Sequence, residues 1–173
     1  MWHILRKVYD PDLKMTVYRA GTNELPTTRG RTVVGGHFSL NQSKQIAPNA
    51  QVISMVRDPL DRVISEVYRN MRFGRYTGPA ENPVLWHVQN NGKSIMRDML
   101  EDLDGVHVGI FEQYNESLRR FAEVLGWDSI PNFSIHNIGV NRVEPGHDEK
   151  LMILEHLQDE YDLYDECVER FNA

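Results

Sequence analysis

Apolar and polar residues follow the same plan in two segments of the chain, each a short apolar strand that leads directly into an amphipathic helix. In the first segment, residues 51–56 are apolar and rich in β-branched side chains, which predicts a buried strand. Asp58 then suits the N-cap of a helix, Pro59 its first position and Gly74 its end. Between them, apolar residues recur every three or four positions and predict one buried face: Leu60, Val63, Ile64, Val67, Tyr68 and Met71.

The second segment repeats this plan, with a predicted strand at residues 106–111 and a helix that ends at Gly126. The apolar face of that helix carries Leu118, Phe121, Ala122 and Leu125. Elsewhere the pattern predicts short strands at 15–18 and 32–34, a helix at 2–9, a surface loop at 74–92 and a long acidic helix at 148–171. Strands that alternate with helices predict an α/β fold, with a parallel sheet flanked by helices in three layers.

Composition narrows the class of protein. The 173 residues fit a single domain spanning 1–173, and the single cysteine excludes an internal disulfide framework. No apolar stretch approaches the roughly 18 residues of a membrane span, and the first residues lack the apolar core of a signal peptide. The net charge is −6, and ten acidic but only two basic residues lie between Glu144 and Arg170, which we interpret as a solvated helix face. We therefore expect no nucleic-acid partner and no membrane span.

Arg57 is the first candidate binding residue. It lies at the end of the predicted strand 51–56, just before a helix N-terminus, where backbone N–H groups and a guanidinium together suit a phosphate. Ser65 lies eight residues further on, away from the apolar stripe. The residue pattern leaves an alternative open: Arg57 pairs with Asp58 or Asp61, and Ser65 and the helix arginines are simply solvated.

His37 is the second candidate. It follows Gly35 and Gly36 at the end of another predicted strand, where glycines allow a ligand to approach the backbone and a histidine titrates near neutral pH. The alternative is a structural loop histidine. The other histidines show no paired spacing typical of metal ligands, so we expect no metal site.

Taken together, these residues resemble a known family. Residues 56–65 resemble the Arg-Asp-Pro-x-x-Arg-x-x-Ser signature of the carbohydrate sulfotransferases that use 3′-phosphoadenosine 5′-phosphosulfate (PAPS), especially the heparan sulfate 2-O-sulfotransferase branch. The resemblance implies a P-loop-kinase-like fold, in which Arg57 and Ser65 bind the 3′-phosphate of PAPS. It further implies that His37 is the catalytic base and that Arg142, in the segment 137–142, steadies the nucleotide. Residues 108–112, 117–118 and 162–164 match weaker features of the family in the same order.

The sequence departs from this family at its start. The family opens with a strand and a Lys-Thr phosphate loop that holds the 5′-phosphosulfate, and no such loop precedes Met1. We expect an N-terminally incomplete chain, truncated or misassigned at its start; a loop supplied by another chain and a degenerate product are the alternatives. We also expect weak binding of the product nucleotide, slow or absent turnover, and a homo-oligomer formed through the exposed sheet edge.

The resemblance implies the partner and the reaction: a sulfuryl group passes from PAPS to a hydroxyl of a carbohydrate or other acceptor. Two rivals remain. A nucleotide phosphotransferase would need a Gly-x-x-x-x-Gly-Lys-Ser/Thr loop, which the chain lacks. A non-catalytic sulfotransferase remnant would bind a nucleotide, a glycan or a protein. The missing secretory signal favours a cytoplasmic location, whereas eukaryotic relatives work in the Golgi lumen.

Overall fold

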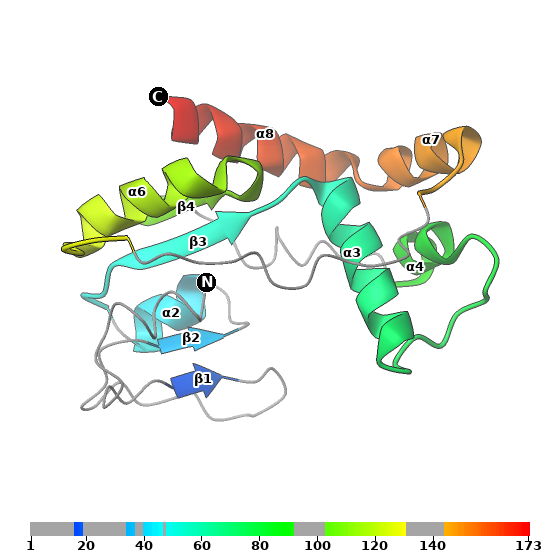
Figure 1. Cartoon of the computed structure of the whole chain (residues 1–173), viewed down its shortest axis with the longest axis horizontal. Helices are drawn as coiled ribbons and strands as arrows, with labels where there is room; N and C mark the ends of the chain where they lie inside the picture. The colour runs from blue at the N-terminus through cyan, green and yellow to red at the C-terminus, as the bar shows by residue number, and fades with distance from the viewer. Residues whose placement is uncertain (1–15, 19–33, 37–39, 47, 92–102, 131–143) are drawn as a thin grey trace. The chain divides into compact units, whose positions relative to one another are not determined.

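The computed structural model describes residues 16–18, 34–36, 40–46, 48–91, 103–130 and 144–173 (Figure 1). Over these residues the chain is mixed α/β and mostly helical. The elements are β1 (Thr16–Tyr18), β2 (Val34–Gly36), α2 (Leu40–Ile46), β3 (Val52–Val56), α3 (Pro59–Arg72), α4 (Pro83–Asn91), β4 (Val106–Ile110), the 3₁₀ turn η1 (Phe111–Gln113), α6 (Tyr114–Leu125), α7 (His147–His156) and α8 (Gln158–Asn172).

Two pairs of strands form small sheets. β1 and β2 pair in parallel, with Thr16 opposite Val34 and Tyr18 opposite Gly36, and β3 pairs with β4. The parallel pairing agrees with the expected α/β class. The wider three-layer arrangement of the sulfotransferase fold stays a prediction.

The chain divides into two compact units. The first consists of residues 1–54, 96–109 and 113–134, and the second of residues 55–95, 110–112 and 135–173. The second unit holds α3, α4, α7 and α8, together with the residues that follow β3 and β4. It therefore contains both Arg57 and Ser65. The expected single domain over residues 1–173 stays a prediction.

The first strand–helix segment agrees closely with its sequence. β3 ends at Val56, and α3 begins at Pro59 after the N-cap Asp58, whose carboxylate accepts a hydrogen bond from the Asp61 N–H at 2.9 Å. Gly74 adopts the left-handed conformation (φ 64°) just beyond the last turn, as its position predicts. The helix therefore has its predicted start and its predicted stop.

The second segment also agrees with its sequence. β4 covers residues 106–110, and α6 buries Leu118, Phe121 and Ala122. Gly126 caps its end at φ 65°, and the Gly126 N–H bonds to the carbonyls of Ala122 and Glu123. The turn η1 separates β4 from α6 and includes Glu112.

The core of the second unit is built on the predicted stripe of α3. Four residues of that stripe pack with apolar residues of α4, α7 and the turn after α7: Leu60, Val63, Ile64, Val67, Val84, Leu85, Val88, Ile153 and Leu157. Tyr68 packs against this cluster, whereas Met71, the last residue of the stripe, is exposed. Cys167, the single cysteine of the chain, is buried on α8.

Two predictions of local structure need correction. The segment 74–92 is not a loop throughout, because α4 forms within it and buries Val84, Leu85 and Val88. The strand predicted at 32–34 overlaps β2 at Val34, and β2 continues through both glycines before His37, whereas residues 32 and 33 lie outside the described residues. The helix predicted at 2–9 lies outside the described residues.

The second correction is a break in the long acidic helix. It divides at Leu157 into α7 and α8, although no glycine or proline is present there. The buried Leu157 occupies the turn, and the two helices have different neighbours: α7 contacts α4, whereas α8 contacts α3. Packing on two different helices therefore accounts for a break that local sequence does not signal.

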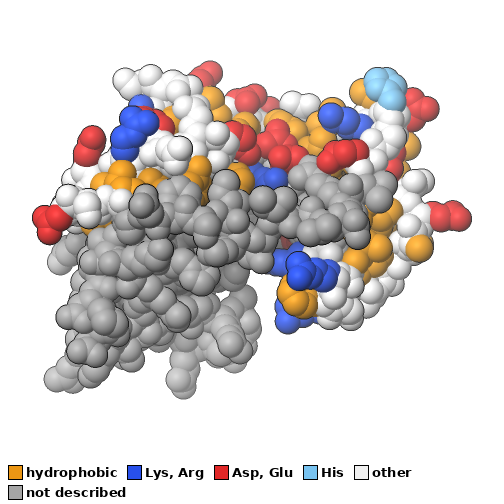
Figure 2. Space-filling model, in the orientation of Figure 1, with side chains coloured by type: hydrophobic (Ala, Val, Ile, Leu, Met, Phe, Trp, Pro, Cys, Tyr) orange, Lys and Arg blue, Asp and Glu red, His pale blue; other side chains and the backbone are white. Residues whose placement is uncertain are grey.

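Most of the acidic residues between Glu144 and Arg170 are exposed, as a solvated face requires. Figure 2 shows acidic side chains at the surface along the top of the view, where Figure 1 places α7 and α8. Glu160 is the exception, because it is buried. Among the described helices, none combines the length and apolar character needed to cross a membrane.

Candidate functional site

The turn between β3 and α3 presents Arg57. Val56, before it, is buried at the end of the strand, and Asp58, after it, caps the helix. The backbone is therefore fixed on both sides of Arg57, while 25% of its side chain remains exposed. A side chain in this position is anchored at its base and only partly exposed.

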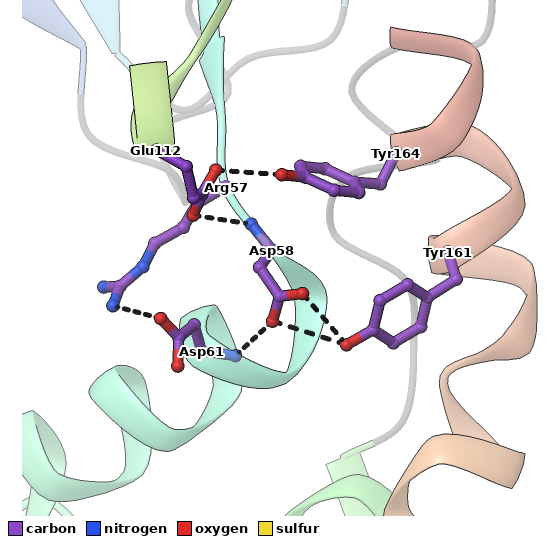
Figure 3. Close-up of polar contacts among 6 residues, drawn as sticks. All are labelled: Arg57, Asp58, Asp61, Glu112, Tyr161 and Tyr164. Atoms are coloured by element: carbon purple, nitrogen blue, oxygen red, sulfur yellow. Dashed lines mark hydrogen bonds and ion pairs between the residues drawn. The ribbon is translucent and has the colours of Figure 1, made fainter. Parts of the chain in front are cut away.

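Two neighbours hold the guanidinium of Arg57. Its Nη2 donates to Asp61 Oδ2 at 3.1 Å, and its central carbon lies 5.0 Å from the centre of the Phe111 ring (Figure 3 shows the Asp61 contact). Its Nε is buried and has no hydrogen-bond partner among the residues that the structure describes. The pairing with Asp61 is one of the alternatives that the sequence leaves open for Arg57.

Ser65 lies on the exposed side of α3. It follows Asp61 by four residues, so the two side chains lie one turn apart on the same helical face. Asp61 thus lies between the two candidates along the chain, four residues after Arg57 and four before Ser65, and it pairs with the Arg57 guanidinium. The roles of Arg57 and Ser65 in binding a cofactor stay predictions.

Two carboxylates close the N-terminus of α3. The Asp58 side chain accepts the Asp61 N–H and also the hydroxyl of Tyr161, at 3.3 Å to Oδ1 and 3.1 Å to Oδ2. The backbone N–H of Asp58 donates to Glu112 Oε1 at 3.1 Å, and Glu112 Oε2 accepts the hydroxyl of Tyr164 at 2.9 Å. Figure 3 shows both tyrosines extending from one helix toward these two acids.

The two tyrosines are held in their neutral form. Burial, with the Asp58 carboxylate as the next cause, raises the pKa of Tyr161 to about 12 from an ordinary value near 10. Burial and then the hydrogen bond to Glu112 raise the pKa of Tyr164 as well. Both hydroxyls therefore remain donors throughout the physiological pH range.

Arg62 and Arg72, which lie within α3, have different partners from Arg57. Arg62 forms ion pairs with Glu160 and with Glu66, at 3.6 Å to Glu66, so its charge is used within the fold. Arg72 lies toward the end of the helix, and its guanidinium lies 5.8 Å from the ring of Phe73, which is 61% exposed. Of these arginines, Arg57 is the one placed at the end of a strand.

Two predicted site residues, His37 and Arg142, lie outside the described residues. The sequence reasoning gave no role to Glu112, Tyr161 or Tyr164. A signal for Glu112 was present, since it follows β4 as closely as Asp58 follows β3, and β3 and β4 are paired. No comparable signal marked the tyrosines.

Within the described ranges, no group of three or more His, Cys, Asp or Glu side chains is arranged to hold a metal ion. Comparison of the chain with protein-family models, curated proteins and solved structures found no match. Residues 56–65 and the contacts of Arg57 are therefore the features of the chain that bear on its function.

Proposed function

We propose that the chain transfers a sulfuryl group from PAPS to a hydroxyl of a carbohydrate acceptor. The main support is that Arg57 follows β3 and pairs with Asp61, which lies one helical turn before the exposed Ser65 on α3. A phosphate bound there contacts a guanidinium and a hydroxyl, the two groups at which the signature 56–65 resembles the family.

The contacts of Arg57 are compatible with this role. Asp61 is partly exposed, and a partly exposed pair of this kind contributes about 1 kcal/mol, so a phosphate can compete with Asp61 for the guanidinium. The Nε of Arg57 is buried, which leaves the two terminal nitrogens as the donors for a phosphate. A phosphate that accepts from two guanidinium nitrogens forms the strong bidentate pairing that arginine favours.

In the proposed reaction, the acceptor oxygen forms a bond to sulfur while the bond from sulfur to the phosphate oxygen breaks. The acceptor proton passes to His37, and adenosine 3′,5′-bisphosphate leaves. Arg57 and Ser65 orient the nucleotide through its 3′-phosphate, and Arg142 steadies it. Sulfuryl transfer makes the same demands as phosphoryl transfer, namely alignment of two oxygens and neutralisation of the leaving group.

The alternative is a non-catalytic module that binds a nucleotide, a glycan or a protein. The observation that favours it is the internal pairing of Arg57 with Asp61, together with carboxylates of the chain itself at the N-terminus of α3. In this alternative, the turn after β3 has mainly a structural role. The two functions differ in what happens when PAPS and an acceptor are supplied together.

Calorimetric titration of adenosine 3′,5′-bisphosphate and of 5′-AMP tests the proposal. We expect Arg57→Ala to weaken bisphosphate binding on the order of 10- to 100-fold and to leave 5′-AMP binding nearly unchanged. Arg69→Ala removes the same charge from an exposed position of α3 and serves as the matched control. Equal affinities in the wild type and Arg57→Ala contradict the site. Release of the bisphosphate from PAPS in the presence of glycans separates the enzyme from the non-catalytic module.

A further inference from the structure

We infer that α8 sets the position of Arg57 through two hydroxyl groups, and that Tyr161 and Tyr164 are positioning residues for the 3′-phosphate site. This inference rests on the proposed function for its ligand, but its geometry does not depend on that function. Both tyrosines lie on one helix, three residues apart, and each donates to a different acid beside Arg57 (Figure 3).

The first connection passes through Glu112. Tyr164 donates to one carboxylate oxygen of Glu112, and the other oxygen accepts the N–H of Asp58. That N–H belongs to the peptide bond between Arg57 and Asp58. Because the Arg57 Cα atom lies in the plane of this peptide, holding the N–H restrains the backbone from which the Arg57 side chain extends.

The second connection passes through Asp58. Its carboxylate accepts the Tyr161 hydroxyl and the Asp61 N–H, which holds the first turn of α3 in place. The side chain of Asp61, on that turn, accepts the Arg57 guanidinium. Both ends of the Arg57 side chain are therefore connected to α8, the base through Tyr164 and the guanidinium through Tyr161.

The two tyrosine hydroxyls also bear on the negative charge around the turn of Arg57. Asp58, Asp61 and Glu112 place three acids around a turn proposed to bind a phosphate. A carboxylate accepts hydrogen bonds only. Without the tyrosine hydroxyls, Asp58 and Glu112 each keep a single backbone N–H as donor, and the remaining carboxylate oxygen can then turn toward the Arg57 guanidinium. The neutral tyrosines give these two acids other partners and leave Asp61 as the acid that pairs with the guanidinium.

Removal of the hydroxyls alone tests this inference, with Tyr161→Phe, Tyr164→Phe and the double variant. Tyr76→Phe is the matched control, because the Tyr76 hydroxyl also donates within the second unit, to the carbonyls of Pro79 and Pro83. The first readout is the ratio of the dissociation constants for 5′-AMP and adenosine 3′,5′-bisphosphate, measured well below the melting temperature of each variant. We expect the double variant to lower this ratio about 10-fold and the control to leave it unchanged.

The second readout needs no ligand. It is the NMR resonance of the Arg57 Nε–H group, assigned by its loss in Arg57→Lys. We expect this resonance to shift in the double tyrosine variant and to stay in place in Tyr76→Phe. A purely structural role lowers the melting temperature without moving the resonance or the ratio.

The outcomes separate the two proposals. An unmoved Arg57 resonance in the folded double variant overturns the inference. An unchanged ratio also overturns it if Arg57→Ala does lower that ratio. If the resonance moves but neither the wild type nor Arg57→Ala distinguishes the two nucleotides, the positioning by α8 is upheld and the proposed function fails.

Discussion

The guanidinium of Arg62 on α3 pairs with the buried carboxylate of Glu160 on α8, 98 residues away in the chain. The Glu160 side chain is only 6% exposed, and that of Arg62 is 24% exposed. Arg57, five residues earlier, has its acid partner at the surface. Arg57 and Arg62 are exposed to nearly the same extent but have different partners, since Arg62 pairs with a buried acid of another helix and Arg57 pairs with a partly exposed acid one turn into α3.

Loss of Arg62 is expected to destabilise the protein strongly. Arg62→Ala leaves Glu160 with a buried charge and no guanidinium partner, for which we expect a loss of about 3 kcal/mol in the free energy of unfolding. The double variant Arg62→Met/Glu160→Met removes both charges and is expected to recover most of this loss. Urea denaturation measures both values. An Arg62→Ala protein as stable as the wild type contradicts the structural role of the pair.

Asp58 is expected to act as a helix cap. Asp58→Ala removes the acceptor for the Asp61 N–H and for the Tyr161 hydroxyl, so we expect a loss of about 1–2 kcal/mol in stability. Asp58→Asn keeps one side-chain oxygen as acceptor, and asparagine caps helices about as well as aspartate, so its loss is smaller. Thermal unfolding followed by circular dichroism checks the order wild type, Asn, Ala. A reversed order of the two variants argues against capping as the main role of this side chain.

Stability is expected to fall at alkaline pH through the two tyrosines of α8. The folded protein raises the pKa of Tyr161 to about 12, so the folded state holds this proton more tightly than the unfolded chain, in which the pKa is near 10. This contribution is complete below pH 10 and is lost as the pH rises through about 12. Tyr164, whose pKa is also raised, changes stability in the same direction.

The measurement is the free energy of unfolding at several pH values between about 8 and 12. Every other tyrosine is present in both proteins, so the difference between the wild type and Tyr161→Phe/Tyr164→Phe isolates the pair. We expect this difference to shrink as the pH rises above 10. A difference that stays constant over the whole range means that the two hydroxyls keep the same proton affinity after folding.

Sequence predicts the first strand–helix segment well because its determinants are local. The apolar strand, the Asp58–Pro59 start, the helical stripe and the left-handed Gly74 all lie within 24 consecutive positions, from residue 51 to residue 74. The sequence does not predict α4, because the glycines and prolines around it favour a loop. The spacing of Val84, Leu85 and Val88 is nevertheless that of a helix. The break at Leu157 has no local cause and depends on which helices α7 and α8 contact.

The candidate site also combines a part that local sequence predicts with a part that it does not. The position of Arg57, after a strand and before a helix, could be predicted from neighbouring residues. Its supporting acids and tyrosines could not, because the Asp58–Glu112 bond joins residues 54 positions apart and the Asp58–Tyr161 bond joins residues 103 apart. Such contacts depend on the tertiary fold, which periodicity does not encode.

The buried thiol of Cys167 can report local unfolding of α8. Burial raises the pKa of this thiol to about 11, so at neutral pH it is both protonated and shielded from reagents. It is also the only cysteine, so every molecule of a thiol-reactive dye that attaches marks this one position on α8. The rate of labelling therefore follows how often this helix transiently detaches, the same event that disconnects both tyrosines from the turn of Arg57.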